Sequence, residues 1–192
     1  HADNAFVAAN CDRIFLAVKP HLMKGALAPL QEALAAHKPL LITMAAGLEI
    51  TKIQEMAGAE LPVIRIMPNT PVAVGSGVIL YDATPTAQVE GFCQAMAHAG
   101  YLHRLPEPLI DAGSALSGCG PAFVCLFAEA LADGAVACGL PRAKAYTYAA
   151  ATMAGAAEMV LTTGTHPGAL KDAVCSPGGS TIAGVRALEH KG

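Results

Sequence analysis

The segment Leu61-Pro-Val-Ile-Arg-Ile-Met67 decides the fold that we expect for the first half of the chain. It is a short and almost continuous apolar run, and Pro68-Asn-Thr-Pro71 ends it. Runs of this kind are typical of strands that are buried on both faces of a parallel sheet. We therefore predict a buried strand here, with strands of the same kind as its neighbours.

Similar apolar runs lie on both sides of this segment. Upstream are Arg13-Ile-Phe-Leu-Ala-Val18, closed by Lys19-Pro20, and residues 39–47. Downstream are residues 77–81 and 101–105. Helices are expected between these runs, over residues 5–11, 21–36, 51–57 and 86–99. Strands that alternate with helices indicate an α/β layer with a largely parallel sheet.

The second half of the chain has a different pattern. No convincing strand follows Pro106–Pro108, and helical spacing dominates instead. Helices are expected over residues 109–116, 121–138, 141–161 and 169–174. We therefore predict two domains, an α/β domain over residues 1–105 and an all-α domain over residues 106–192.

The composition excludes several classes of protein. The chain is 54% hydrophobic and 14% charged. Glu129, Asp133 and Glu158 interrupt its longest apolar stretches, so no membrane-spanning helix is expected. The apolar excess instead favours an interface between subunits. The net charge of −3 comes without a basic run, which argues against a nucleic-acid partner.

Neither the cysteines nor the histidines form a metal or redox motif. The six cysteines include no Cys-x-x-Cys, and most have apolar neighbours, as reduced cysteines of a cytoplasmic protein do. The seven histidines form no His-Glu-x-x-His, so we expect no metal.

The common nucleotide-binding and hydrolase motifs Gly-x-Gly-x-x-Gly, the P-loop and Gly-x-Ser-x-Gly are all absent. The residues alone thus support a dehydrogenase-like protein only weakly.

Ser176-Pro-Gly-Gly-Ser-Thr181 is predicted to be a tight turn that opens onto a helix. Ile182, Val185 and Leu188 follow it at the spacing of one buried helical face. The free amides of the first helical turn and the positive end of the helix dipole would suit a small carboxylate. The alternative is an ordinary Gly-Gly turn with a Ser or Thr cap.

Seven blocks of the chain, in order, resemble the pyrroline-5-carboxylate reductase family. They are Phe15-Leu-Ala-Val-Lys-Pro20, Met44-Ala-Ala-Gly47, Arg65-Ile-Met-Pro-Asn-Thr-Pro71, Ala115-Leu-Ser-Gly-Cys-Gly-Pro-Ala122, Gly139-Leu-Pro-Arg142, His166-Pro-Gly168 and the segment from Lys171 to Glu189. The resemblance implies an N-terminal Rossmann domain and a C-terminal helical domain that dimerises, often within larger rings. It also implies reduction of 1-pyrroline-5-carboxylate to L-proline, the last step of proline biosynthesis, with NADPH or NADH.

The chain departs from the family pattern in three places. The family begins with a strand, a Gly-rich phosphate loop, a helix and a second strand, which are missing before His1, and it continues beyond Lys191-Gly192 into a final helix. We therefore expect a truncated chain, with a partial Rossmann-type parallel sheet followed by a helical dimerisation domain. Cys119 stands where the family usually has Ser, a change that should alter the polarity of the pocket.

The resemblance implies roles for single residues on the substrate side. Thr181 would be the catalytic residue, because its hydroxyl would hydrogen-bond the ring nitrogen of the substrate. Ser176, Gly178, Gly179 and Ser180 would hold the substrate carboxylate. Glu107 would approach the substrate; the alternative is a solvated loop carboxylate. Lys171-Asp172 is interpreted mainly as a structural pair.

The resemblance also implies a cofactor side. Ala17, Val18, Lys19 and Pro20 would lie along the cofactor, and Ala45 and Ala46 would border its nicotinamide. Asn69 and Thr70 would hydrogen-bond the cofactor or hold their own loop. Residues 117–121 would line the pocket.

Two other functions remain open. A related keto- or hydroxy-acid reductase should carry a Lys or His base on the first long helix of the second domain, where this chain offers Glu129 and Asp133. A non-catalytic oligomerisation or regulatory fragment would explain the missing phosphate loop.

Overall fold

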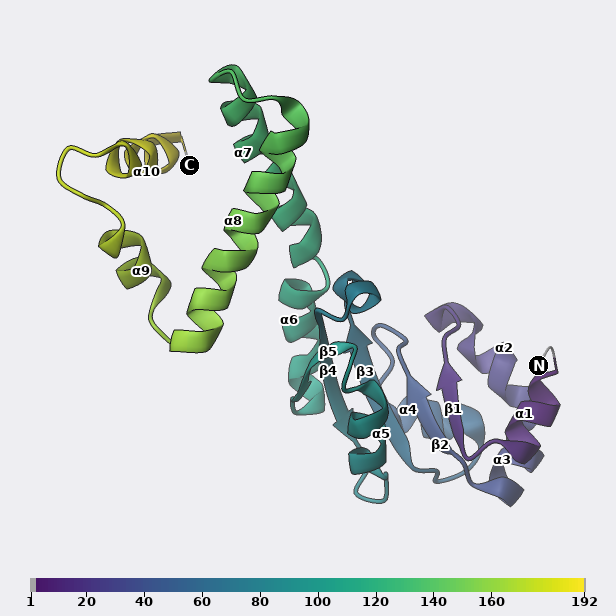
Figure 1. Ribbon diagram of the computed structural model, residues 1–192. Coiled ribbons are helices and arrows are strands. Elements are labelled where there is room, and N and C mark those ends of the chain that lie inside the picture. Colours follow the sequence, from purple (N-terminus) through teal and green to yellow (C-terminus); the bar gives the residue numbers. More distant parts are fainter. Residues whose placement is uncertain (1–2, 192) are drawn as a thin grey trace. The chain divides into compact units, whose positions relative to one another are not determined.

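The computed structural model describes residues 3–191 and divides into two compact units, residues 1–123 and residues 124–192. The first unit is built on a five-stranded sheet with the order β1-β2-β3-β4-β5 (Figure 1). Its strands are β1 Arg13–Leu16, β2 Leu40–Thr43, β3 Val63–Pro68, β4 Gly77–Ala83 and β5 Gly100–Arg104. All five predicted strands are confirmed, with ends that differ by up to a few residues.

The sheet is largely parallel, as predicted, with one reversal. β1, β2 and β3 are parallel, β4 is antiparallel to β3, and β5 is parallel to β4. The reversal follows from the link between β3 and β4, which holds only the short 3₁₀ helix η3 Thr70–Val74. Such a link is too short for the crossover that parallel strands require.

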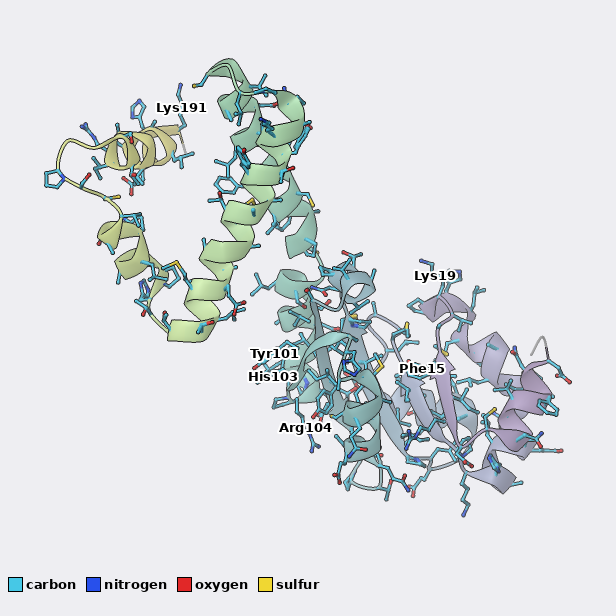
Figure 2. All side chains as sticks on the ribbon, in the orientation of Figure 1. Phe15, Lys19, Tyr101, His103, Arg104 and Lys191 are labelled. Atoms are coloured by element: carbon cyan, nitrogen blue, oxygen red, sulfur yellow. The ribbon has the colours of Figure 1, made fainter. Side chains whose placement is uncertain are left out.

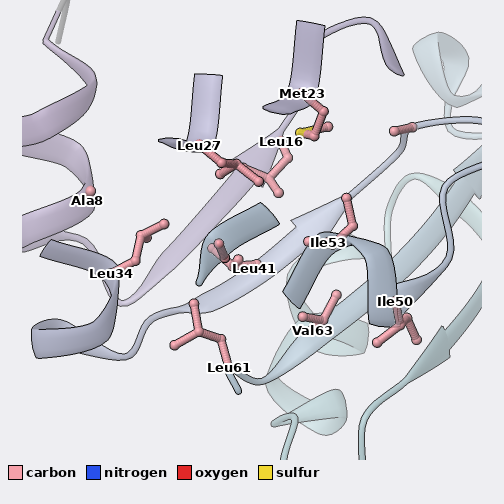
Figure 3. Close-up of a cluster of buried hydrophobic side chains, with 12 residues drawn as sticks. Ala8, Leu16, Met23, Leu27, Leu34, Leu41, Ile50, Ile53, Leu61 and Val63 are labelled. Atoms are coloured by element: carbon pink, nitrogen blue, oxygen red, sulfur yellow. The ribbon is translucent and has the colours of Figure 1, made fainter. Parts of the chain in front are cut away.

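Four helices of the first unit lie on one face of the sheet: α1 Asn4–Asn10, α2 Met23–Leu27, α3 Gln31–His37 and α4 Ile50–Ala57. Figure 3 shows the core they make, in which Leu27, Leu34 and Ile53 pack against strand residues such as Leu41. The single helix expected over residues 21–36 is wrong. The 3₁₀ helix η1 Pro20–Leu22 takes the place of its first residues, and η2 Ala28–Leu30 divides the rest, because Pro29 cannot sit inside an α-helix.

The opposite face of the sheet is covered by α5 Val89–Met96. Phe92 of this helix is fully buried and meets Tyr81 of β4 edge to face, with ring centroids 5.8 Å apart. An aromatic pair in this geometry stabilises a core beyond its buried area.

The helix α6 Glu107–Ser117 packs on the same face as α4. Ile110 is fully buried, and a side chain at Gly113 would run into Leu80 of β4. The first compact unit therefore includes α6, although the sequence places the domain boundary at residues 105/106. That boundary stays a prediction.

The second unit holds the remainder of α7 Gly120–Ala137, then α8 Arg142–Thr163, α9 Pro167–Ala173 and α10 Ser180–Lys191. Within its described residues the buried apolar side chains are those of Ala132, Ala145 and Ala149. The expected buried face of α10 is not formed within this chain, since Ile182 and Val185 are half-buried and Leu188 is 59% exposed.

The stretch Glu107–Ala137 is long and apolar enough to cross a membrane, in contrast to the expectation that acidic residues leave no such stretch. A single stretch of this kind is weak evidence for a membrane segment, because core helices have the same composition. Its first part, α6, packs on the sheet through Ile110.

Candidate functional site

The carboxyl ends of β1, β2 and β3 meet at one edge of the sheet. In the parallel register Leu16 pairs with Thr43, and Thr43 pairs with Arg65. The segments that follow these strands therefore emerge side by side, at the edge where ligands of such sheets bind. They are residues 17–20, 44–49 and 69–71, which contain all eight residues predicted to contact a cofactor. Ala17, Val18 and Lys19 are exposed there, and Figure 2 labels Lys19.

The turn after β2 is fixed by a hydrogen bond to the last residue of the strand and by a hydrogen bond within the turn. The hydroxyl of buried Thr43 accepts a hydrogen bond from the Ala45 amide at 3.3 Å, and the Leu48 amide donates to the Ala45 carbonyl at 3.4 Å. Gly47 has φ = 70°, a conformation that side chains disfavour. Ala45 is 2% exposed and belongs to the core, whereas Ala46 faces solvent. Only Ala46 of this pair therefore presents its side chain to a ligand.

Asn69 holds its own loop, which is one of the two roles expected for it. Its side-chain oxygen accepts from the Val78 amide at 2.8 Å, and its side-chain nitrogen donates to the Ser117 carbonyl at 2.9 Å. These bonds join the end of β3 to the start of β4 and to the last residue of α6. They also bring the start of segment 117–121 to the same edge, while Thr70 is exposed. Cys119 of that segment is exposed as well.

The predicted substrate turn lies in the second unit and has the expected form. Gly178 has φ = 69°, and the Gly179 amide donates to the Ser176 carbonyl at 3.0 Å. A side chain at Gly179 would collide with the hydroxyl of Ser176. Ser180 begins α10, and Ser176, Ser180 and Thr181 are exposed. The turn therefore presents hydroxyl groups and first-turn amides to solvent, an arrangement that can bind a carboxylate.

The helix α9, which leads into this turn, is capped by a histidine. Nδ1 of His166 accepts a hydrogen bond from the Gly168 amide at 3.1 Å. Lys171 and Asp172 form an exposed ion pair at 2.8 Å, and the hydrogen bond to Asp172 raises the pKa of Lys171 above its ordinary value. Both contacts are local, as the structural interpretation of Lys171-Asp172 expects.

An ion cluster centred on buried Arg65 joins β3 to α6, and sequence reasoning missed its centre. Arg65 of β3 is 1% exposed. One guanidinium nitrogen is 2.6 Å from Asp111 Oδ1 and another is 3.4 Å from Glu107 Oε1. The available signal was a lone arginine within an apolar strand, because a buried charge requires partners.

Glu107 belongs to this cluster. Its carboxylate accepts a hydrogen bond from the Ile50 amide at 2.7 Å and also contacts Arg65, so the carboxylate links α6 to α4 and to β3. The predicted approach of Glu107 to a substrate stays a prediction. Among residues 3–191, no group of three or more His, Cys, Asp or Glu side chains is placed to hold a metal ion.

Comparison with known proteins identifies relatives for the whole chain. A family model described as pyrroline-5-carboxylate reductase dimerisation matches residues 107–192. Pyrroline-5-carboxylate reductase from Glycine max is 44% identical over 192 residues, covering 98% of this chain and 69% of the relative. The enzyme of the same name from Escherichia coli is 43% identical over 192 residues, covering 97% of this chain and 70% of the relative.

Solved structures agree with these relatives. The crystal structure of Plasmodium falciparum pyrroline carboxylate reductase with NADP bound matches this chain with a TM-score of 0.89 and 34% identity, covering 100% of this chain and 73% of that protein. A Streptomyces aurantiacus imine reductase matches with a TM-score of 0.56 at 16% identity, which shows a shared fold alone.

Proposed function

The chain belongs to the pyrroline-5-carboxylate reductase family, and from this premise we propose that it catalyses the NAD(P)H-dependent reduction of 1-pyrroline-5-carboxylate to L-proline. The observation that carries the proposal is the identity of 44% and 43% with two reductases of that name over nearly the whole chain. This reaction is the last step of proline biosynthesis. It makes the protein an oxidoreductase that acts on a C=N bond.

The carboxyl edge of β1, β2 and β3 fits a nicotinamide cofactor. Exposed Val18 and the small, exposed Ala46 offer apolar neighbours to a planar ring, and Lys19 offers a cation to a phosphate. Pro20 and Thr70 flank the same edge, whereas Ala45 supports the turn from within the core. When bound, NADPH or NADH supplies the hydride. The chain's part is to bind and orient the two reactants.

The turn at the start of α10 would bind the substrate. Its first-turn amides, together with Ser176, Gly178, Gly179 and Ser180, would hold the carboxylate, because a helix N-terminus favours an anion. The hydroxyl of Thr181 would hydrogen-bond the ring nitrogen and help to supply its proton. A protonated imine is already electrophilic, so this chemistry does not require a strong base. The left-handed φ of Gly178 supports this role, since it shapes the turn.

We also propose an assembly and a location for the protein. The match of residues 107–192 to the dimerisation family supports self-association through the helical region, as a dimer or a larger ring. We also propose a cytoplasmic location, which the six free cysteines support.

The test is oxidation of NADPH that depends on 1-pyrroline-5-carboxylate, followed by the loss of NADPH absorbance. The 192-residue chain is assayed beside the protein as its gene encodes it. Two control substrates are a keto acid with NADPH and, for the reverse reaction, a hydroxy acid with NADP⁺. Oxidation with the pyrroline substrate alone is expected. Activity with a keto or hydroxy acid instead would favour the related reductase, and no activity with any substrate would favour a non-catalytic oligomerisation role.

A further inference from the structure

The helix α4 takes its N-terminal cap from another part of the chain. Its own N-cap residue, Glu49, makes no capping hydrogen bond with its side chain. The Ile50 amide donates instead to Oε1 of Glu107 at 2.7 Å, across 57 residues of sequence. The first amides of a helix have no intrahelical acceptor, and a carboxylate there also interacts favourably with the helix dipole. Glu107 thus fixes the start of α4.

Glu107 is itself held firmly. Its amide donates to Oδ2 of Asp82 on β4 at 2.9 Å, and its carboxylate lies 3.4 Å from the guanidinium of Arg65. That guanidinium is almost fully buried and also contacts Asp111, one turn further along α6. A buried arginine needs its carboxylate partners, so both the backbone and the side chain of Glu107 are fixed in place.

The segment between β2 and α4 therefore has two anchors. At its start, Thr43 accepts from the Ala45 amide at 3.3 Å. At its end, Glu107 accepts from the Ile50 amide. Ala46 and Gly47 are exposed between these anchors, and Gly47 has a left-handed φ of 70°. The bond from the Leu48 amide to the Ala45 carbonyl closes this turn, and the contacts at its two ends set where it lies.

We propose that Glu107 is a positioning residue for the cofactor: from α6 it fixes the start of α4 and so sets the position of the Ala45–Ala46–Gly47 turn. This inference rests on the proposed function, which places a nicotinamide beside that turn. It gives Glu107 a different role from the predicted contact with substrate. It also makes α6 a common support, because Asn69 of the neighbouring cofactor segment bonds to the carbonyl of Ser117 at the other end of this helix.

The experiment compares Glu107→Ala and Glu107→Gln with Glu49→Ala in the protein as its gene encodes it. Glu49→Ala is the matched control, since it removes a carboxylate from the same helix terminus without removing a cap. The Gln variant keeps a side-chain oxygen that can accept from Ile50. The two main measurements are hydrogen exchange of the Ile50 amide without cofactor and the Kd for NADP⁺ by calorimetry. Neither measurement requires catalysis.

In Glu107→Ala, exchange of the Ile50 amide is expected to accelerate and the Kd for NADP⁺ to rise, each roughly tenfold, the factor that one lost hydrogen bond to a charged group gives. Glu49→Ala should stay within about twofold of wild type, as expected for an exposed carboxylate. Glu107→Gln should lie between wild type and Glu107→Ala in both measurements, because it keeps an acceptor for the Ile50 amide but removes the charge that pairs with Arg65. In kinetics, the KM for NADPH should rise in Glu107→Ala while the KM for 1-pyrroline-5-carboxylate stays unchanged.

Unchanged exchange of Ile50 in Glu107→Ala would overturn the proposal, as would faster exchange with an unchanged Kd for NADP⁺. A rise in the KM for 1-pyrroline-5-carboxylate alone would overturn it in favour of a substrate contact. If the wild-type protein binds NADP⁺ but does not reduce the substrate, the proposed function fails, while exchange and NADP⁺ binding still decide the role of Glu107. A wild-type protein that does not bind NADP⁺ would overturn both.

Discussion

The two compact units place their apolar side chains differently. In the sheet unit Phe92, Ile53 and Ile66 are between 0% and 1% exposed, so the core closes within one chain. In the helical unit Leu126 is 66% exposed and Leu161 is 80% exposed. The match of residues 107–192 to the dimerisation family explains the contrast. The first unit is stabilised by its own packing, whereas the second requires a partner copy to cover its apolar surface.

The largest expected effect is the loss of Phe92. Phe92→Ala should reduce the free energy of unfolding by about 3–5 kcal/mol, since it leaves a cavity in a closed core. Leu161→Ala, on the exposed surface of α8, should change it by less than about 0.5 kcal/mol in the dissociated protein. Urea denaturation at low protein concentration measures both. Equal losses of unfolding free energy in the two variants would show that the helical unit also buries its apolar side chains within one chain.

Breaking the association between copies should have the next largest effect. Leu126→Glu should raise the dissociation constant of the oligomer by about a hundredfold, because a charge would be buried where an apolar anchor packs. Leu22→Glu, at a similarly exposed position of the sheet unit, should leave the dissociation constant unchanged. Sedimentation velocity over a concentration series measures both. An unchanged oligomer in Leu126→Glu would contradict a role for the exposed apolar surface of α7 in self-association.

Strain in the predicted substrate turn, residues 176–181, should have a smaller and more local effect. Gly178→Ala forces a side chain into a left-handed conformation, which costs about 1–2 kcal/mol. Gly164→Ala at the end of α8 imposes the same strain, since the two φ values are 69° and 63°. Both variants should lose similar stability, but only Gly178→Ala should raise the KM for 1-pyrroline-5-carboxylate. An equal rise in this KM in both variants would show that the turn at Gly178 has no specific role in substrate binding.

The smallest expected effect concerns Tyr81 in the core of the sheet unit. Burial, followed by the contact with Cys93, raises the pKa of Tyr81 above its ordinary value. The folded state then keeps its proton when the unfolded state ionises, so stability should fall as the pH rises above the ordinary pKa of tyrosine. Tyr81→Phe should flatten this alkaline loss, and exposed Tyr148→Phe should not. Denaturation midpoints across alkaline pH provide the measurement, and identical profiles for the two variants would contradict the burial argument.

The sheet could be predicted because its signals are local. Continuous apolar runs indicated each strand, and Pro68 indicated where β3 ends, whereas β1 ends at Leu16, before Lys19-Pro20. The reversal at β4 could not be predicted from the runs alone, because it depends on the length and conformation of residues 69–76. The break in the helix expected over residues 21–36 could have been predicted from Pro29. The helical spacing of the apolar residues suggested one continuous helix instead.

The site could be predicted only in part, for a similar reason. Strand ends indicate which segments share an edge, and Gly178-Gly179 indicates a turn. The cap of α4 by Glu107 joins residues 57 positions apart, and Arg65 meets Asp111 across 46 positions. No local pattern encodes such pairs. Sequence reasoning can note that a buried arginine requires partners, but the fold selects them.

The most direct test of the account is the kcat/KM of Thr181→Ala for 1-pyrroline-5-carboxylate, measured by NADPH oxidation beside wild type and Thr181→Ser. Thr181 is exposed, so the substitution should leave the fold unchanged. We predict a loss of roughly 10²-fold or more in the Ala variant, the lower range for a positioned proton-transfer partner, and partial recovery in the Ser variant. A loss of less than about threefold in the Ala variant would contradict the catalytic role of Thr181, because removal of such a partner costs far more.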